Sequence, residues 1–461
     1  TGPGPLQDIR CDNGDDDRHI GQESIGKLFG KLFFPTVAGM MFSVLLIITD
    51  GIFVGHGLGS DALAAVNIVA PAWTFATGTA LMFGMGGSII ASISLSQGQE
   101  KKARVYMSIS LIISTLFLLI CSALILVFPH TSLRLLGCSE ELMPLAKLYL
   151  LGFIPFSASN AFLVSGSFFV RLNGAPKFAM ICSITAAVIN LVLDYLFIFP
   201  LQFGIMGAAI ATSIGSLVGA AMTAVYLSNK NRKLHFCTIS SARTGIAITH
   251  ALKRVCTLGF PSFLGELALS FMMLVGNIVF MKYLGKDGVA AFSISCYFFP
   301  IIFMLDSAIA QSAQPIISYN HGIGDKKRIS SATRLALTAA ILCSVLISGI
   351  TFIYSHGISS MFVSAESPAH AIATAGFPLY ALGFIPCAIN IIAITHFQSI
   401  ERSNIAMLIT LMRGFIFLGL AFWIMPIILG INGIWLAVPA GEAITCLITI
   451  AIALGSSKKK H

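Results

Sequence analysis

Charged residues are scarce in this sequence. Of its 461 residues, 10% are charged and 56% are hydrophobic, whereas a soluble domain carries about a quarter charged residues. With so few charges, most of the surface cannot face water, which excludes an ordinary soluble globular protein. Apolar stretches recur along the whole chain, and a helix of about 20 residues crosses the core of a bilayer. The composition therefore predicts a membrane protein.

Signatures of enzymes and of metal sites are also missing. The ten cysteines are dispersed, with no CxxC pair and no Cys/His cluster, so we predict neither a disulfide framework nor a cysteine-based metal site. The sequence has no Walker-type phosphate loop and no convergent catalytic set of Ser, His and Asp. We therefore expect no enzyme, no cofactor and no coupling to ATP.

The positive net charge has a distribution that favours membrane orientation over nucleic-acid binding. The net charge is +9, and basic residues such as Lys101, Lys102 and Arg104 gather in alternate connections, while few, such as Arg134 and Lys147, lie in the others. Cytoplasmic loops carry the excess of Lys and Arg. We therefore predict a multi-pass protein of a cell membrane, the bacterial inner membrane, with both termini cytoplasmic. The predicted spans are 28–54, 63–96, 105–128, 143–171, 177–199, 205–227, 250–283, 289–319, 333–355, 371–400, 404–428 and 433–454.

The two halves of the sequence resemble each other. The clearest matches pair residues 58–61 with 284–287 and residues 152–155 with 383–386. The second match, Gly-Phe-Ile-Pro in both halves, continues to Arg171 in the first half and to Arg402 in the second. Each half holds six spans, so both halves enter the membrane from the same side. We expect an all-α polytopic fold with two six-helix lobes related by a pseudo-two-fold axis along the membrane normal, as in parallel-repeat transporters.

The repeat gives the expected domain organisation and mechanism. A pair of such lobes encloses a central cleft, and rocking exposes that cleft to one side of the membrane at a time. We expect a transporter that works as a monomer. The predicted divisions are a disordered cytoplasmic tail at 1–24, an N-lobe at 25–227, a cytoplasmic inter-lobe loop at 228–249, a C-lobe at 250–454 and a basic cytoplasmic tail at 455–461.

Acidic residues inside the first half form a candidate cation site. Asp50 lies in the first span and Asp194 in the fifth, where Asn190 shares its helical face, and Thr212 in the sixth span adds a hydroxyl. Ionised side chains at mid-membrane cost about 2.5–3.5 kcal/mol, so they need a partner or water. Carboxylate, amide and hydroxyl oxygens suit a small cation such as sodium, with Asp50 and Asp194 as its metal ligands. The same carboxylates could instead hold a proton or merely cap helix ends.

The second half carries a different set of charges. Glu266 and Asp306 could line the cleft and attract a cationic substrate, and Met273 could belong to an adaptable wall for varied ligands. Buried hydrogen bonding is the alternative for the two acids, and contact with lipid is the alternative for the methionine. We expect Arg413 and Glu442, each inside a span, to be structural and able to pair with each other.

Two prolines occupy matched positions in the first and seventh spans. Pro35 and Pro261 are 226 residues apart, and each removes a backbone hydrogen bond from its helix. Bending at these points could re-aim Asp50. We therefore predict hinges at both, with a static kink as the alternative.

The sequence resembles the multidrug and toxic compound extrusion (MATE) family over about residues 25–455. The resemblance rests on the segments 50–55 with 58–59, 62–65, 314–317 and 319–322, and on Asn190 with Asp194. The four first-half residues match the DinF-like branch, where they form the coupling-cation site. The resemblance implies a V-shaped fold and antiport by alternating access. It also implies a first span that bends as the site fills, and export of cationic or amphipathic organic compounds in exchange for sodium ions or protons.

A lipid-linked precursor flippase of the same superfamily is the alternative transporter. Such proteins tend to have extra spans and a cationic cavity for phosphates. Twelve spans, and five acidic residues against Arg413 within them, disfavour this reading. The expected partners are therefore small organic cations or amphipathic drugs, sodium or a proton, and the lipid bilayer, with no nucleic acid.

Overall fold

The protein is described by a computed structural model that covers residues 23–136, 138–237, 247–362 and 365–458. Most of the predicted N-terminal tail, the middle of the inter-lobe loop and the last three residues lie outside the described residues. The described part of the chain is built of helices and contains no strand. This confirms the prediction of an all-α polytopic membrane protein.

The first half forms six spans. Its elements are α2 (Ile25–Leu58), α3 (Ser60–Ser96), α4 (Glu100–Val127), α5 (Pro129–Leu135), α6 (Met143–Phe153), η1 (Ile154–Phe156), α7 (Ser157–Leu172), α8 (Pro176–Ile198) and α9 (Gly204–Ser228). A short 3₁₀ turn at Pro155 joins α6 to α7, because proline cannot donate the next helical hydrogen bond. The two helices together make the fourth span.

The second half repeats this pattern. Its elements are α11 (Ile248–Ile323), α12 (Lys326–Ile353), α13 (Ser355–Phe362), α14 (Pro368–Ala381), α15 (Phe384–Ser399), α16 (Ser403–Leu411), the π-helix η2 (Met412–Ile416) and α17 (Phe417–Lys458). Two of these helices are broken by one glycine each, Gly285 in α11 with φ 64° and Gly430 in α17 with φ 59°. Divided at these breaks, and with α14 and α15 taken as one bent span, the described chain has the twelve spans that the sequence predicts.

The repeat is visible in the backbone itself. Gly59 and Gly204 in the first half also have positive φ, and they stand 226 residues before Gly285 and Gly430. Glycine tolerates this conformation because it has no Cβ. The short helices α5 and α13, which the apolar pattern did not predict, begin at Pro129 and Ser355, again 226 apart. The halves are thus alike even in their turns.

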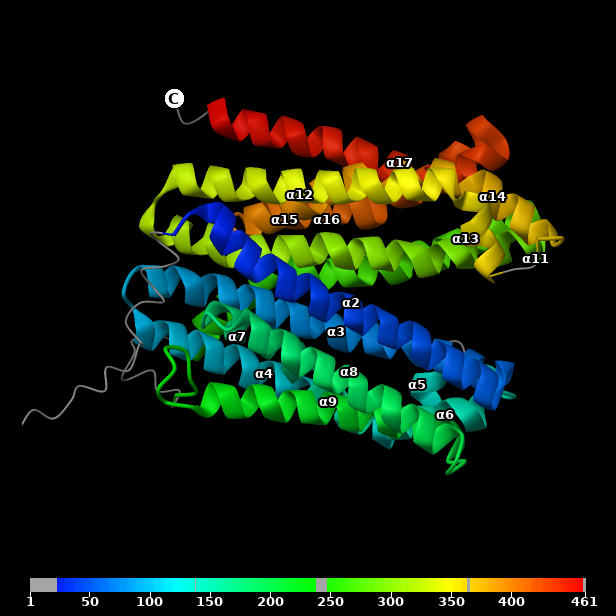
Figure 1. The fold of residues 1–461 in the computed structure, drawn as a ribbon, viewed down its shortest axis with the longest axis horizontal. Coiled ribbons are helices and arrows are strands. Elements are labelled where there is room, and N and C mark those ends of the chain that lie inside the picture. Colours follow the sequence, from blue (N-terminus) through cyan, green and yellow to red (C-terminus); the bar gives the residue numbers. More distant parts are fainter. Residues whose placement is uncertain (1–22, 137, 238–246, 363–364, 459–461) are drawn as a thin grey trace, which may run out of the picture.

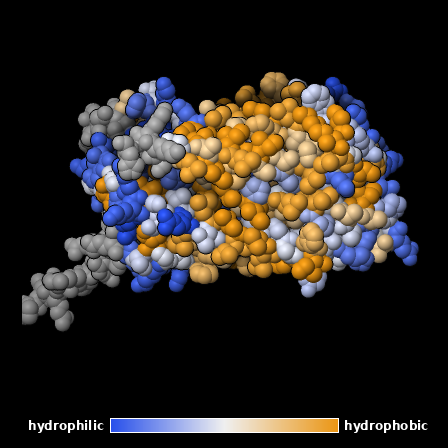
Figure 2. Space-filling view, turned by 90° about the horizontal axis from the view of Figure 1, so that it is seen from above, coloured by the Kyte–Doolittle hydropathy of each residue, from blue (hydrophilic) through white to orange (hydrophobic). Residues whose placement is uncertain are grey.

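The surface agrees with a membrane setting. Figure 2 shows a broad apolar band around the middle of the molecule, with hydrophilic residues gathered toward its ends. Large apolar side chains on the long helices, such as Leu116, Ile120, Leu346 and Leu447, are exposed. Within the described residues, nine helices are long and apolar enough to cross a membrane before the bent pair and the glycine breaks are considered.

Helix α2 connects the two halves. In Figure 1 it begins beside α12 and runs diagonally to end among the helices of the first half. Leu28, Phe29 and Leu32 near its start belong to the large apolar core of the second half. Farther along, Gly39 packs against Met180 of α8, and small residues allow such close approach of membrane helices. Helix α2 therefore contacts the second half through its first turns and the first half along the rest of its length.

The two halves are packed tightly against each other at the end that carries the basic loops. Gly259 of α11 lies directly against the backbone of Met82 in α3. Nearby, the hydroxyl of Ser88 donates to the Gln314 side-chain oxygen at 3.2 Å. A side chain at Gly259 would collide with the facing helix, so the glycine is needed for this contact.

Candidate functional site

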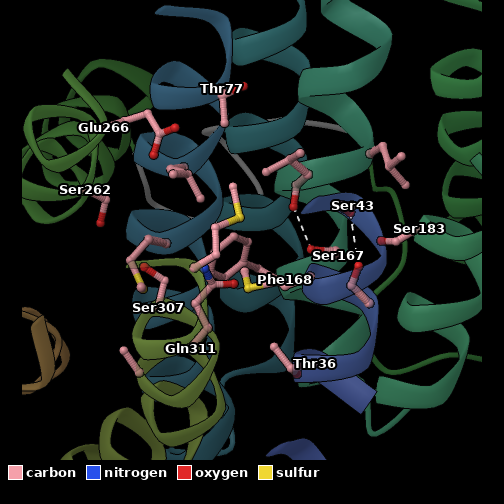
Figure 3. Close-up of a pocket in the computed structure, with 18 of the residues that line it drawn as sticks. Thr36, Ser43, Thr77, Ser167, Phe168, Ser183, Ser262, Glu266, Ser307 and Gln311 are labelled. Carbon is pink, nitrogen blue, oxygen red and sulfur yellow. Dashed lines mark hydrogen bonds between the residues drawn. The ribbon is translucent and has the colours of Figure 1, made fainter. Parts of the chain in front are cut away.

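A cavity of about 280 Å³ lies between the two halves. Its walls come from α2, α3, α7, α8, α9, α11, α15, α16 and the π-helix η2, so both lobes contribute. Figure 3 shows Glu266 and Gln311 from α11 and Phe168 from α7 around this space. Of the residues predicted from the sequence, Pro35, Asn190, Thr212, Pro261 and Glu266 line it.

The four predicted residues of the first half do come together. The carboxyl groups of Asp50 and Asp194 lie within hydrogen-bonding reach of each other. The Asn190 Nδ2 donates to Asp194 Oδ2 at 2.9 Å and to Thr212 Oγ1 at 3.2 Å. Asp194 is completely buried, behind the cavity wall that Asn190 and Thr212 form. The site is therefore adjacent to the cavity without being open to it.

Two ionised carboxylates so close together would repel each other and could not bond to each other, since each only accepts hydrogen bonds, so a proton or a cation would stabilise the pair. The Oδ1 atoms of both have no partner among the described residues. The amide of Asn190 donates to this cluster through its nitrogen.

The side chains of Arg413 and Glu442 form an ion pair, which the sequence analysis named as possible. The Arg413 Nη2 donates to Glu442 Oε1 at 2.6 Å, and Nε adds longer bonds to both oxygens. The Asn390 amide donates to Glu442 Oε2 at 2.8 Å. Both members of the pair are about 5% exposed. A buried charge is tolerated when it is paired and hydrogen-bonded. We therefore assign this pair a structural role.

Asp306 and Met273 are not on the cavity wall, which corrects their prediction as substrate-binding residues. Met304 and Ser307 line the cavity, and Asp306 between them points to the other side of α11, since successive residues of a helix face different directions. Asp306 is completely buried in the second half, with neither carboxyl oxygen bonded to a described residue. Met273 packs against the apolar core of the same half.

The two prolines stand on the cavity wall inside continuous helices. Pro35 lies within α2 and Pro261 within α11, and both contact the same space. Any bend at either proline would change the shape of the cavity directly. Their role as hinges stays a prediction.

Arg171 is a cavity residue that the sequence did not single out. It is 7% exposed, at the end of α7, and its Nη2 donates to Ser167 Oγ at 3.1 Å and to Gln311 Oε1 at 2.9 Å. Its guanidinium carbon lies 4.7 Å from the ring centre of Phe168. Gln311 belongs to the other half of the molecule. The one signal in the sequence was the match of Arg171 with Arg402 in the repeat.

Comparison with known families identifies the fold that carries this site. The family model MatE matches residues 35–196 and 261–423. The chain belongs to the MatE family. The two matched segments begin at Pro35 and Pro261, at the same offset of 226 residues as the internal repeat. Membership confirms the predicted MATE resemblance, and with it a membrane transporter and not an enzyme. The DinF-like branch stays a prediction.

Similar MATE proteins cover nearly the whole chain. The multidrug export protein MepA of Staphylococcus saprophyticus is 23% identical over 420 residues, which is 91% of each chain. An FAD transporter of Shewanella oneidensis is 24% identical over 436 residues, 92% of this chain and 93% of that protein. A solved outward-facing multidrug resistance MATE transporter superposes with a TM-score of 0.88 at 22% identity, covering 96% of this chain and 98% of that one. The superposition shows a shared fold.

Proposed function

We propose that this MATE protein is a secondary active exporter of cationic or amphipathic organic compounds. It exchanges them for protons, or else for sodium ions, bound at Asp50 and Asp194. The observation that carries the proposal is the close pair of carboxyl groups, set directly behind the wall of the inter-lobe cavity. A site that gains or loses one charge next to the substrate space can make the two occupancies depend on each other.

Helix α2 supplies a physical route for this coupling. It carries Asp50 near its end, Pro35 on the cavity wall, and Leu28 and Leu32 in the core of the second half. Proton loss from the carboxyl pair would break the hydrogen bond to α8 and leave a negative charge between the helices. Either helix movement or a replacing cation would relieve it. Movement of α2 would alter its contact with both lobes at once.

The cavity wall suits varied organic compounds. Trp73, Phe168 and Phe303 supply aromatic surface, and Met85 and Met304 supply flexible thioether side chains, which adapt to ligands of different shape. Glu266 provides a carboxylate that bonds to no described residue. The relatives named for multidrug export support the same class of substrate.

Export of FAD is a second candidate function. One relative is named an FAD transporter, and the cavity-facing guanidinium of Arg171 suits the negative charge of a dinucleotide. The two candidates share the fold and the coupling site and differ only in what occupies the cavity.

Orientation follows from the charge pattern together with the packing. We propose that the basic loops and both termini are cytoplasmic, in the bacterial inner membrane. The cavity is bordered on that side by Arg171 and Pro176, at the ends of α7 and α8 that the basic connections join.

Efflux from proteoliposomes tests this function. The purified protein is reconstituted, and export of cationic dyes and of FAD is measured with a proton gradient alone and with a sodium gradient alone. We expect uphill export of at least one of these compounds with one gradient and none without a gradient. Absence of uphill movement for every compound under both gradients would refute the proposal.

A further inference from the structure

We propose that Arg171 is a recognition site for an anionic group, a carboxylate or a phosphate, on the exported compound, and that this group competes with Gln311 for the guanidinium. The inference rests on the proposed export function and adds a substrate class to it. The expected compounds are aromatic amphipaths that carry an anionic group. Purely cationic compounds would not use this site.

The charge of Arg171 is not neutralised by the protein. In the part of the chain that the structure describes, no carboxylate lies within ion-pair distance of it, and its acceptors are the neutral side chains of Ser167 and Gln311. Arg413 also lines the cavity, but Glu442 neutralises it. A buried cation without a counter-charge is costly, so an arriving anion gains more at Arg171 than at Arg413.

Arg171 lines the cavity and has donors that the protein does not use. A guanidinium has five N–H groups in a fixed fork, and both described bonds are made by Nη2. Nε and Nη1 bond to no described residue, and neither is among the unpartnered atoms that the protein encloses completely. Each edge of a guanidinium that makes two parallel bonds to a carboxylate or phosphate includes Nη2, so such a group would use Nε or Nη1 together with Nη2 and take the place of a present acceptor.

The guanidinium is held in place before a ligand arrives. Phe168, one turn of helix away on α7, lies against it at 4.7 Å, and Ser167 accepts a bond from it at 3.1 Å. Figure 3 shows Ser167 and Phe168 on the cavity wall, with Gln311 also bordering the space. A pre-oriented donor loses little freedom on binding, which favours affinity.

The same guanidinium links the two lobes. Arg171 belongs to the first half and Gln311 to the second, and their 2.9 Å bond crosses between them. A charged acceptor binds a guanidinium more strongly than a neutral amide oxygen does. An anionic group on Nη2 would therefore displace Gln311 and weaken the contact between the lobes. Substrate binding would in this way favour separation of the lobes at Arg171.

The opposite charge of Glu266 defines the compounds more closely. Glu266 lines the same cavity from α11 and bonds to no described residue. The cavity thus offers one unpaired cation on the first half and one carboxylate on the second. A zwitterionic aromatic compound, with its anionic group at Arg171, satisfies both.

A matched pair of dyes tests the assignment. The probes are a xanthene dye with a free carboxylate, which is zwitterionic, and the methyl ester of the same dye, which is cationic. Binding to the full-length protein in detergent is measured by fluorescence anisotropy, and efflux is measured from proteoliposomes. We expect the wild type to bind the free acid about tenfold more tightly than the ester, as a charge-assisted bidentate contact allows.

Variants separate recognition from structure. Arg171→Gln should lose about tenfold in affinity for the free acid and keep its affinity for the ester. Arg171→Lys keeps the charge and should retain part of the preference. Gln311→Leu removes only the competing acceptor, so it should preserve or increase binding of the free acid. Arg402→Gln changes the repeat-related arginine, which is not on the cavity wall, and should leave both dyes unaffected.

The possible results distinguish failure of the anion site at Arg171 from failure of the export function. Equal affinity of the wild type for both dyes overturns the inference, as does an equal loss for both dyes in Arg171→Gln. If that variant does not fold, the wild-type preference and its partial retention in Arg171→Lys decide. Failure of the wild type to move either dye under any gradient refutes the export function instead, and the binding preference for the free acid stands or falls separately.

Discussion

The carboxyl groups of Asp50 and Asp194 lie within hydrogen-bonding reach of each other across the contact between α2 and α8. A proton shared between them would join the pair, since two ionised carboxylates only accept hydrogen bonds. Asn190 fixes the orientation of Asp194 from the same helix and also faces the cavity. We expect a proton held by this pair to be released when substrate binds and taken up again when substrate leaves.

Replacement of Asp194 should separate coupling from folding. Asp194→Asn keeps the size of the side chain and can donate a hydrogen bond to Asp50, so the protein should fold. It can no longer take up and release a proton, and gradient-driven efflux should fall to the background of empty liposomes. Efflux and melting temperature are the measurements. Asp287→Asn, at an exposed position, is the matched control and should transport normally. Normal efflux by Asp194→Asn would exclude the first-half site.

The buried charges of the second half should differ sharply in their tolerance of substitution. Glu442→Gln leaves Arg413 buried and unpaired, which typically costs about 3–5 kcal/mol. Asp306 has no described hydrogen-bond partner and is completely buried, so it is expected to be neutral. Asp306→Asn should then cost less than about 1 kcal/mol. Thermal unfolding in detergent measures both. A larger loss of stability in Asp306→Asn than in Glu442→Gln would contradict this expectation and indicate that Asp306 is ionised.

The close contact between the lobes should be sensitive to one methyl group. Gly259 lies against the backbone of Met82, so Gly259→Ala forces the lobes apart where they are closed. Overpacking of this kind costs about 1–3 kcal/mol. We expect a lower melting temperature and slower efflux. Gly349→Ala, at a helical glycine with open space around it, is the control. Equal behaviour of the two variants would contradict the packing argument.

Glu401 should give the protein an acid-sensitive contact outside the spans. Its bonds to His321 and Arg254 lower the pKa of Glu401 from 4.5 to about 2. Because the folded-state pKa is the lower one, the contact stabilises the protein above about pH 4.5 and is lost as the pH falls toward 2. Glu401→Gln should therefore have a lower melting temperature than the wild type at pH 7. This difference in melting temperature should become smaller in acid. Glu140→Gln, in an exposed pair, should change little.

Local patterns in the sequence were enough to predict the fold. Apolar length gave the spans, and repeated turn signals such as Gly59 and Gly285 gave the duplication, because both depend on residues close together in the chain. The spacing of Asn190 and Asp194 likewise placed both on one helical face, and the structure brings Asp50 to the same point.

Other features of the site depended on how helices rotate and dock. Neighbouring residues of a helix face different directions, so the spans alone did not show that Asp306 points away from the cavity. The bond between Arg171 and Gln311 joins residues 140 apart in the chain. No local pattern predicts such a contact, since it follows from the packing of one lobe against the other.

The most direct test of coupling at Asp50 and Asp194 is to measure proton release when substrate binds. The purified protein in weakly buffered detergent solution is mixed with a transported dye, and the pH change is recorded. The account predicts release of about one proton per bound dye from the wild type, none from Asp194→Asn, and no dependence on sodium. Binding without proton release, or equal release from Asp194→Asn, would contradict it.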